Sequence, residues 1–218
     1  MANALQVDVR QADVTRATAD GVGTKAMRGL RDGSLSMADF LEVMIMEGRG
    51  YVANMGSVTT PLTFLATAAN RPDAWLRVPS GTAILPLAVE TILESAAGTA
   101  TEIDIRMAQN DIGNGTSSAA TVGPLPLRSD APRTSNVTPR QLATGDTTAE
   151  TNPVSLHRRC FPLAQATGLV PYEDFWTPRP MAILVGPATL EVFIAGTTNQ
   201  ATGFVLFRWL ELPSTAIV

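Results

Sequence analysis

The sequence predicts an all-β protein: a two-sheet antiparallel sandwich of the jelly-roll type, preceded by an extended N-terminal arm and one short helix. After Gly48 the spacing of apolar residues changes from about 3.6 to about 2, the period of a strand with one buried face. Gly, Pro, Asn and Ser recur between the alternating segments and mark turns. About nine short strands with connections of Greek-key length fit two packed sheets. An immunoglobulin-like sandwich is the alternative, without the usual disulfide because the chain has one cysteine.

The first 48 residues are expected to form a region of their own, with the sandwich over residues 49–218. Alternation at residues 5–9 is compatible with one short strand. Residues 11–33 are charged, contain several glycines and show no period, which indicates an extended arm.

A helix is expected over residues 37–47. Ser36 can cap its first turn, with Asp39 three residues later, and Gly48 can end it. Its apolar face would consist of Phe40, Leu41, Met44 and Ile45.

Strands are expected at residues 51–55, 62–68, 74–78, 82–94, 101–109, 156–162, 181–185, 189–195 and 203–211. In the fifth of these, Ile103, Ile105 and Met107 alternate with charged residues, the pattern of a strand with one face on a core. Pro86 cannot donate to a ladder, so its strand should lie at an edge, or be bulged or bent there. Residues 111–152 are irregular and rich in Gly, Pro, Ser and Thr, which predicts exposed loops with one or two short strands.

The last strand, residues 203–211, is apolar at almost every position. We therefore expect both of its faces to be covered, one by the core and the other by a neighbouring chain or the arm. An oligomer interface is expected to involve Phe40, Leu41, Met44, Phe204, Phe207 and Trp209.

Composition excludes several classes of function. Charged residues make up 17% of the chain and the net charge is −4, so no global field draws it to nucleic acid or anionic lipid. Residues 50–70 carry no charge, yet polar residues interrupt them too often for a membrane-spanning helix. With one histidine and one cysteine, the chain cannot build a site that needs two imidazoles, and we expect neither metal nor cofactor.

Catalytic constellations are weak, and we expect no enzyme activity. Cys160 lies three positions from His157 and should point to the opposite strand face, which indicates a surface histidine beside two solvated arginines and a buried structural cysteine. The stretch from Asp111 to Gly115 is better explained as a Gly-rich turn than as a calcium loop. The close acid pairs, expected to be solvated rather than catalytic, are Glu90 with Glu94, Glu102 with Asp104, and Glu173 with Asp174.

Four segments carry a resemblance to a known family: Trp75–Leu87, Pro180–Ala195, Thr202–Phe204 and Arg208–Pro213. Their texture resembles that of jelly-roll structural proteins of tailed-bacteriophage virions. The resemblance implies a head-decoration or minor capsid protein, made in the host cytoplasm and placed on the capsid exterior. It also implies a homo-oligomer, commonly a trimer, whose arm docks onto the major capsid protein. The chain lacks the long spine helix and the size of a tailed-phage major capsid protein.

Two other function classes remain open at this point. A carbohydrate- or receptor-binding β-sandwich of a virion could use the irregular loops, with stacking surfaces from Tyr51, Trp75, Tyr172 and Trp176. A hydrolase would have to use His157 and the acid pairs named above.

Overall fold

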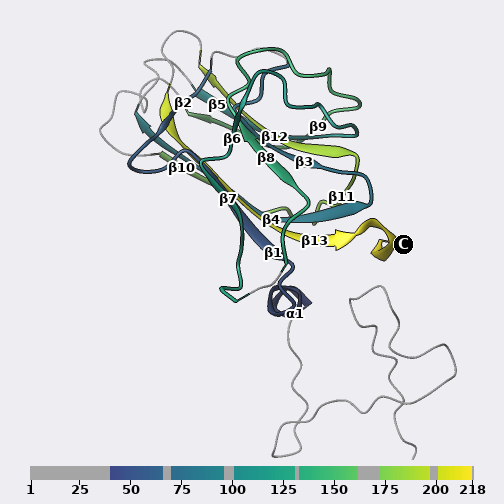
Figure 1. Ribbon diagram of the computed structural model, residues 1–218. Coiled ribbons are helices and arrows are strands. Elements are labelled where there is room, and N and C mark those ends of the chain that lie inside the picture. The colour runs from purple at the N-terminus through teal and green to yellow at the C-terminus, as the bar shows by residue number, and fades with distance from the viewer. Residues whose placement is uncertain are drawn as a thin grey trace, which may run out of the picture. The chain divides into compact units, whose positions relative to one another are not determined.

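A computed structural model describes residues 40–65, 70–95, 101–130, 133–161, 172–196 and 201–217 (Figure 1). The expected arm and the expected strand at residues 5–9 lie outside these residues. The chain divides into two compact units, residues 1–43 and residues 44–218, and every strand among the described residues belongs to the second.

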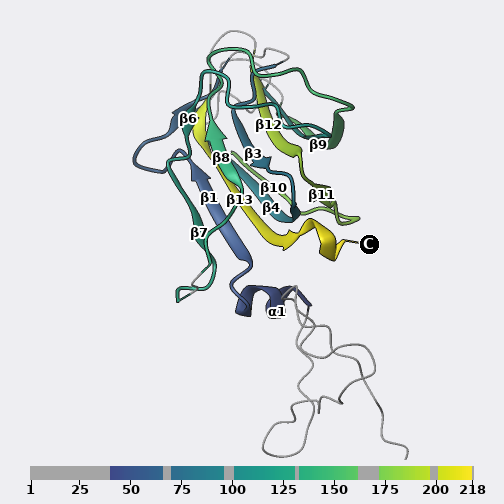
Figure 2. The ribbon, with the colours of Figure 1, turned by 45° about the vertical axis from the view of Figure 1, so that its right-hand side comes forward.

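The second unit contains two antiparallel sheets, as Figures 1 and 2 show. In spatial order, the seven-stranded sheet contains β10 (Tyr172–Trp176), β4 (Thr82–Ser95), β13 (Thr202–Pro213), β1 (Gly50–Met55) and β7 (Val122–Pro126), with β11 (Leu184–Val185) paired to β4 and β2 (Leu62–Thr63) paired to β13. The six-stranded sheet has the order β6 (Ser118–Ala119), β8 (Thr138–Gln141), β3 (Ala74–Val78), β12 (Ala188–Gly196), β5 (Thr101–Ala108) and β9 (Val154–Phe161). The prediction of an all-β antiparallel sandwich is confirmed.

Alternation along the strands produces the core between the sheets. Ile103 and Ile105 of β5 point inward, as predicted, and join a single cluster with residues of the other sheet. From β13, Phe207 and Trp209 enter the same cluster, and the Trp209 ring stacks on Tyr51 with centroids 6.0 Å apart. Fully burying one such side chain stabilises the fold by about 1.5–3 kcal/mol.

The strand that contains Pro86 is bulged, which was one of the predicted outcomes. The register between β4 and β13 shifts between Arg208 and Trp209, opposite Ala88 and Pro86. On its other side, β4 pairs with β10 from Val89 to Leu93 and with β11 at Ala83 and Ile84. Pro86 lies between these two pairings, where the ladder needs no backbone donor from it.

Helix α1 (Phe40–Met46) lies within the expected range. Gly48 has φ +74°, which suits glycine, and its amide donates to the carbonyl of Ile45 at 2.9 Å. The amide of Arg49 donates to Met44 at 3.0 Å, so the predicted glycine stop is confirmed.

Residues 111–152 differ from the prediction of exposed loops with one or two short strands. They contain three strands, β6, β7 and β8, and part of the segment is buried. The periodicity did not reveal these strands because β6 has two residues and β7 carries two prolines and a glycine. Strand β10 was also missed, whereas β2 and β11 are each shorter than expected.

Candidate interaction face and charged clusters

The outward side of the seven-stranded sheet carries a group of apolar residues together with Asn54, Glu90, Glu173 and Arg208. Directly paired residues on antiparallel strands share a face, and the register joins Asn54, Leu206, Glu90 and Phe175 in one row across β1, β13, β4 and β10. We call the apolar residues of this side the outer apolar face: Val52, Ile92, Val122, Leu125, Phe175, Phe204 and Leu206.

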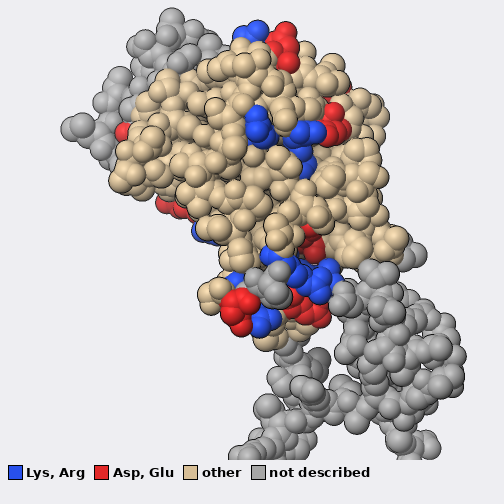
Figure 3. All heavy atoms as spheres, viewed as in Figure 1, with Lys and Arg blue, Asp and Glu red and all other residues tan. Residues whose placement is uncertain are grey.

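Exposure varies across the outer apolar face. Phe175 and Leu125 are 51% and 50% exposed, and Phe204 and Leu206 near its centre are half-buried. Arg208 and Glu90 form an ion pair of 3.2 Å on the same side. Charged side chains are also sparse over much of the described surface in the view of Figure 3. An apolar sheet face of this kind is typical of a surface that contacts a partner.

The predicted interface residues separate into two groups. Phe204 lies on the outer apolar face, whereas Phe207 and Trp209 are only 1% and 0% exposed in the core. Met44 is buried and Leu41 is half-buried, and the side chain of Phe40 lies outside what the structure describes. A contact through the outer apolar face would therefore use Phe204 and not Phe207 or Trp209.

Two of the four sheet edges, β7 and β9, are poorly suited to pairing with another chain. Pro124 and Pro126 interrupt the donors of edge strand β7. Edge strand β9 carries Arg158 and Arg159, whose side chains project largely into solvent. Proline and charge on edges are common protections against edge-to-edge association.

The outward side of the six-stranded sheet is covered by the chain itself. Trp75 projects outward from β3 and is fully buried with Ala108, Ile112 and Ala143 in a second small core. Its indole N–H donates to the carbonyl of Gly113 at 3.3 Å. On the same side, the Arg77 guanidinium holds the pKa of Asp111 below its ordinary value through bonds of 2.5 and 2.7 Å.

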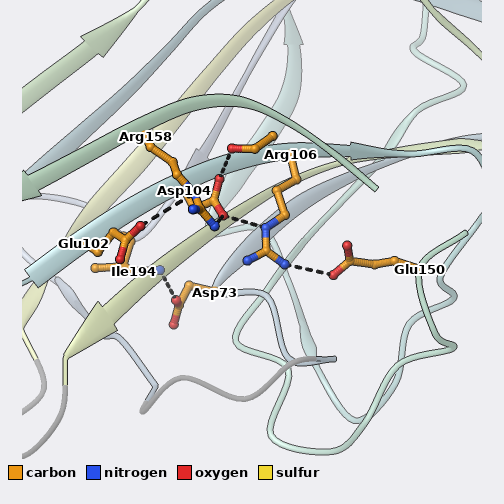
Figure 4. Close-up of polar contacts among 8 residues, drawn as sticks. Asp73, Glu102, Asp104, Arg106, Glu150, Arg158 and Ile194 are labelled. Carbon is orange, nitrogen blue, oxygen red and sulfur yellow. Dashed lines mark hydrogen bonds and ion pairs between the residues drawn. The ribbon is translucent and has the colours of Figure 1, made fainter. Parts of the chain in front are cut away.

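Asp104, which was expected to be solvated, is buried on this side. Its carboxylate accepts hydrogen bonds from Ser155 Oγ at 2.6 Å, Arg106 Nε at 2.6 Å and Arg158 Nη2 at 3.0 Å (Figure 4). Burial raises the pKa of Asp104, but these three donors outweigh it and hold the pKa below the ordinary value. The solvated assignment was wrong because the donors on β9 are about fifty positions away.

Arg106 also reaches a second acid, Glu150, with 3.4 Å between Nη1 and Oε1 (Figure 4). Glu150 lies close enough to Glu191 on β12 for the two carboxyls to affect each other's pKa, and Glu191 is 0% exposed. Burial and the negative charge of Glu150 raise the pKa of Glu191 to about 8, against the lowering effect of Arg106. Sequence analysis overlooked this pair, whose members are forty-one positions apart.

Asp73 is a further buried acid. Its two carboxylate oxygens accept from the backbone amides of Leu65 and Ile194, each at 2.7 Å, so it connects the chain after β2 to β12. Burial raises the pKa of Asp73 to about 7, although both amide bonds lower it.

His157 connects the two sheets at one side of the sandwich. Its Nε2 lies 2.9 Å from Asp174 Oδ2 on β10, and Arg159 Nη1 lies 3.0 Å from Asp174 Oδ1. Phe161 and Tyr172 pack beside them with centroids 5.3 Å apart. Cys160 is exposed, so the expectation of a buried cysteine was wrong: on this edge strand it points away from the core.

A cavity of about 300 Å³ lies at the end of β13. Arg49, Arg133 and Tyr51 line it together with Glu211, which accepts from Ser135 Oγ at 2.7 Å and from the Asn136 amide at 3.0 Å. Glu211 thus attaches the chain around residue 135 to the sheet.

The aromatic residues considered for ligand stacking are mostly in the interior. Tyr51, Trp75 and Trp176 are buried, and Tyr172 is half-buried. Their rings therefore do not form an exposed stacking platform in this structure.

Comparisons with known proteins do not assign the chain to a family: no family model and no curated protein matches it. Among the described residues, no group of three or more His, Cys, Asp or Glu side chains is arranged to hold a metal ion. No helix in the described part of the chain has the length and apolar character needed to cross a membrane.

Proposed function

We propose that this protein is a non-enzymatic structural subunit that assembles with copies of itself through the outer apolar face. In line with the resemblance given above, we propose a jelly-roll virion protein of a tailed phage. It would decorate the head or serve as a minor capsid component, as a homotrimer anchored on the major capsid protein by its N-terminal arm.

The observation that carries the proposal is the set of outward-facing side chains on β13. Phe204 is paired with Ile92 of β4, Leu206 lies between Asn54 of β1 and Glu90 of β4, and Phe175 and Leu125 place apolar side chains at both sheet edges. Removing such side chains from water contributes about 25 cal/mol per Å² of apolar surface, the dominant favourable term in subunit association. At the β7 edge, the prolines favour contact through the face of the sheet rather than extension of the sheet.

The charged residues also support a structural role. Asp104, Asp174 and Glu211 each bind side chains or amides from distant segments and so connect strands and loops. The arrangement is suited to a rigid subunit, because these contacts of Asp104, Asp174 and Glu211 join different elements of the sandwich.

A second candidate, a carbohydrate- or receptor-binding module of a virion, is supported by the polar cavity at the end of β13. Asn136, Arg133 and Glu211 offer hydrogen-bonding groups of the kind that orient a polar ligand. Glycan-array binding that is lost on Asn136→Ala would favour this candidate, and silence across a broad array would count against it.

Static light scattering of the purified full chain tests the assembly proposal. We expect a mass near three subunits, retained when residues 1–33 are deleted, because the proposed contact lies on the sandwich. A monomer at every concentration would overturn the proposal. Co-sedimentation with capsids of the source phage tests the anchor: the full chain should bind, and the truncated chain should not.

A further inference from the structure

The pair formed by Glu150 and Glu191 has no role in the proposed assembly. Glu191 projects from the centre of β12 toward the covered outer side of the six-stranded sheet and is fully buried. Within the described ranges, neither of its oxygens has a hydrogen-bond donor, and the same holds for Oε2 of Glu150. Two adjacent buried carboxylates would repel each other, and leaving buried polar atoms without partners is costly.

A proton on one of the two acids resolves both problems. If Glu191 carries it, its O–H donates to Glu150, and one bond provides partners for oxygens of both side chains. Two carboxyls that share a site in this way hold one proton more strongly than either would alone.

The charges around the pair lead to the same conclusion. From β5, Arg106 lies opposite Glu191 in the register and Asp104 lies next to Arg106. From β9, Arg158 binds Asp104 and the largely solvated Glu102. On β3 the residue opposite Glu191 is Trp75, and the nearby Arg77 is neutralised by Asp111. The four acids Glu102, Asp104, Glu150 and Glu191 therefore outnumber the two guanidinium groups beside them, and this excess of negative charge favours a proton on the pair.

We propose that Glu150 and Glu191 share one proton at neutral pH and form a latch, one of several contacts that hold residues 142–153 over the six-stranded sheet, and that this latch opens when the proton is lost at alkaline pH. Hydroxide removes the proton as water, which leaves two carboxylates in contact. The raised pKa of Glu191, about 8, places the opening just above neutrality.

The segment that carries Glu150 is also bonded to the chain before β3, to the residue after β5 and to the neighbouring covering loop. Leu142 N donates to Asp73 O at 2.8 Å, Gln109 N donates to Thr151 O at 2.9 Å, and Thr148 N donates to Ile112 O at 2.8 Å. Ala143 contributes to the small core around Trp75. Repulsion between Glu150 and Glu191 would weaken one contact of this segment, next to the bond between Thr151 and Gln109.

Urea unfolding at pH 6 and pH 9 tests the latch with Glu191→Gln and the matched control Glu102→Gln. The amide that the first substitution introduces can still donate to Glu150, so this variant should resemble the wild type at pH 6. At pH 9 its folding equilibrium constant should exceed the wild-type constant by at least about tenfold, which corresponds to one pKa unit. Glu102→Gln should lose as much stability between pH 6 and pH 9 as the wild type does. The part of this loss that comes from Asp73 is common to all three proteins and does not affect the comparison.

Infrared spectroscopy of the unmodified protein provides a second test that does not depend on the folding of a variant. The carbonyl band of buried protonated carboxyls should be lost between pH 7 and pH 10 in two steps, one for Asp73 with a pKa of about 7 and a later one for the pair, and the later step should coincide with faster amide exchange at Thr148 after correction for the intrinsic rate. An equal loss of stability in wild type and Glu191→Gln, or a band lost in one step near pH 7, would overturn the proposal.

Discussion

The two sheets differ in how their outward faces are covered. Outside the six-stranded sheet, the chain covers its own strands: Trp75 is fully buried beneath loop residues, and Asp104 is bound by three donors. Outside the seven-stranded sheet, Phe204 and Leu206 are only half-buried and Phe175 is largely exposed. Arg208 and Glu90 form an ion pair there.

This difference between the two outward faces predicts which substitutions should change stability and which should change assembly. A face that is satisfied within the chain contributes to the folding of one subunit, so changes on it should alter stability. A face that the described chain leaves partly exposed contributes little to the fold of one subunit but can contribute to association. Predictions on the two faces should therefore differ in kind as well as in size.

The largest effect is expected for Trp75→Ala on the covered face. The substitution empties the centre of the small core and removes the indole donor to Gly113, and we expect a loss of about 5 kcal/mol in the free energy of unfolding. Urea denaturation measures it, with Val58→Ala, an exposed apolar residue elsewhere, as the control. A loss below about 1 kcal/mol would mean that the covering loops contribute little to stability.

A pH effect of up to about 4 kcal/mol is expected from Asp73. Because burial raises its folded pKa from 3.8 to about 7, the folded state binds the proton more tightly than the unfolded state. This contribution is fully present below pH 3.8 and is lost as the pH rises to about 7. Asp73→Asn should flatten the stability profile in this window, and an unchanged profile would show that the carboxylate is ionised at little cost.

The smallest effect is expected for Arg208→Gln on the outer apolar face. Its pair with Glu90 is partly exposed, and such pairs contribute about 0–1 kcal/mol. Thermal unfolding of dilute protein should therefore change little. A loss above about 2 kcal/mol would indicate that this face supports the subunit's own fold.

Sequence patterns predicted the long strands, but they did not predict which outward sheet face is covered by the chain and which is left partly exposed. Strands β5 and β12 have regular alternation, a local property, and they were located within one or two residues at each end. Strand β7 was missed because its prolines and glycine hide the period, yet tertiary pairing to β1 still forms it.

The candidate interface was predicted in part for a similar reason. Almost every residue of β13 is apolar, so the sequence did not distinguish the inward Phe207 and Trp209 from the outward Phe204. The buried position of Asp104 depends on Ser155 and Arg158, which come from another strand. The pairing of Glu150 with Glu191 depends on a loop that folds back over the sheet. None of these contacts is indicated by the pattern of residues close together in the sequence.

The most direct test of the account compares Leu206→Lys with Val58→Lys by sedimentation equilibrium. Both replace an apolar residue with a charge, but only Leu206 lies on the outer apolar face, where the new lysine would be opposite Glu90 and should not harm the fold. We expect the Leu206 variant to be a folded monomer and the Val58 variant to keep the mass of the wild-type oligomer. A Leu206 variant that still assembles like the wild type would contradict the central claim.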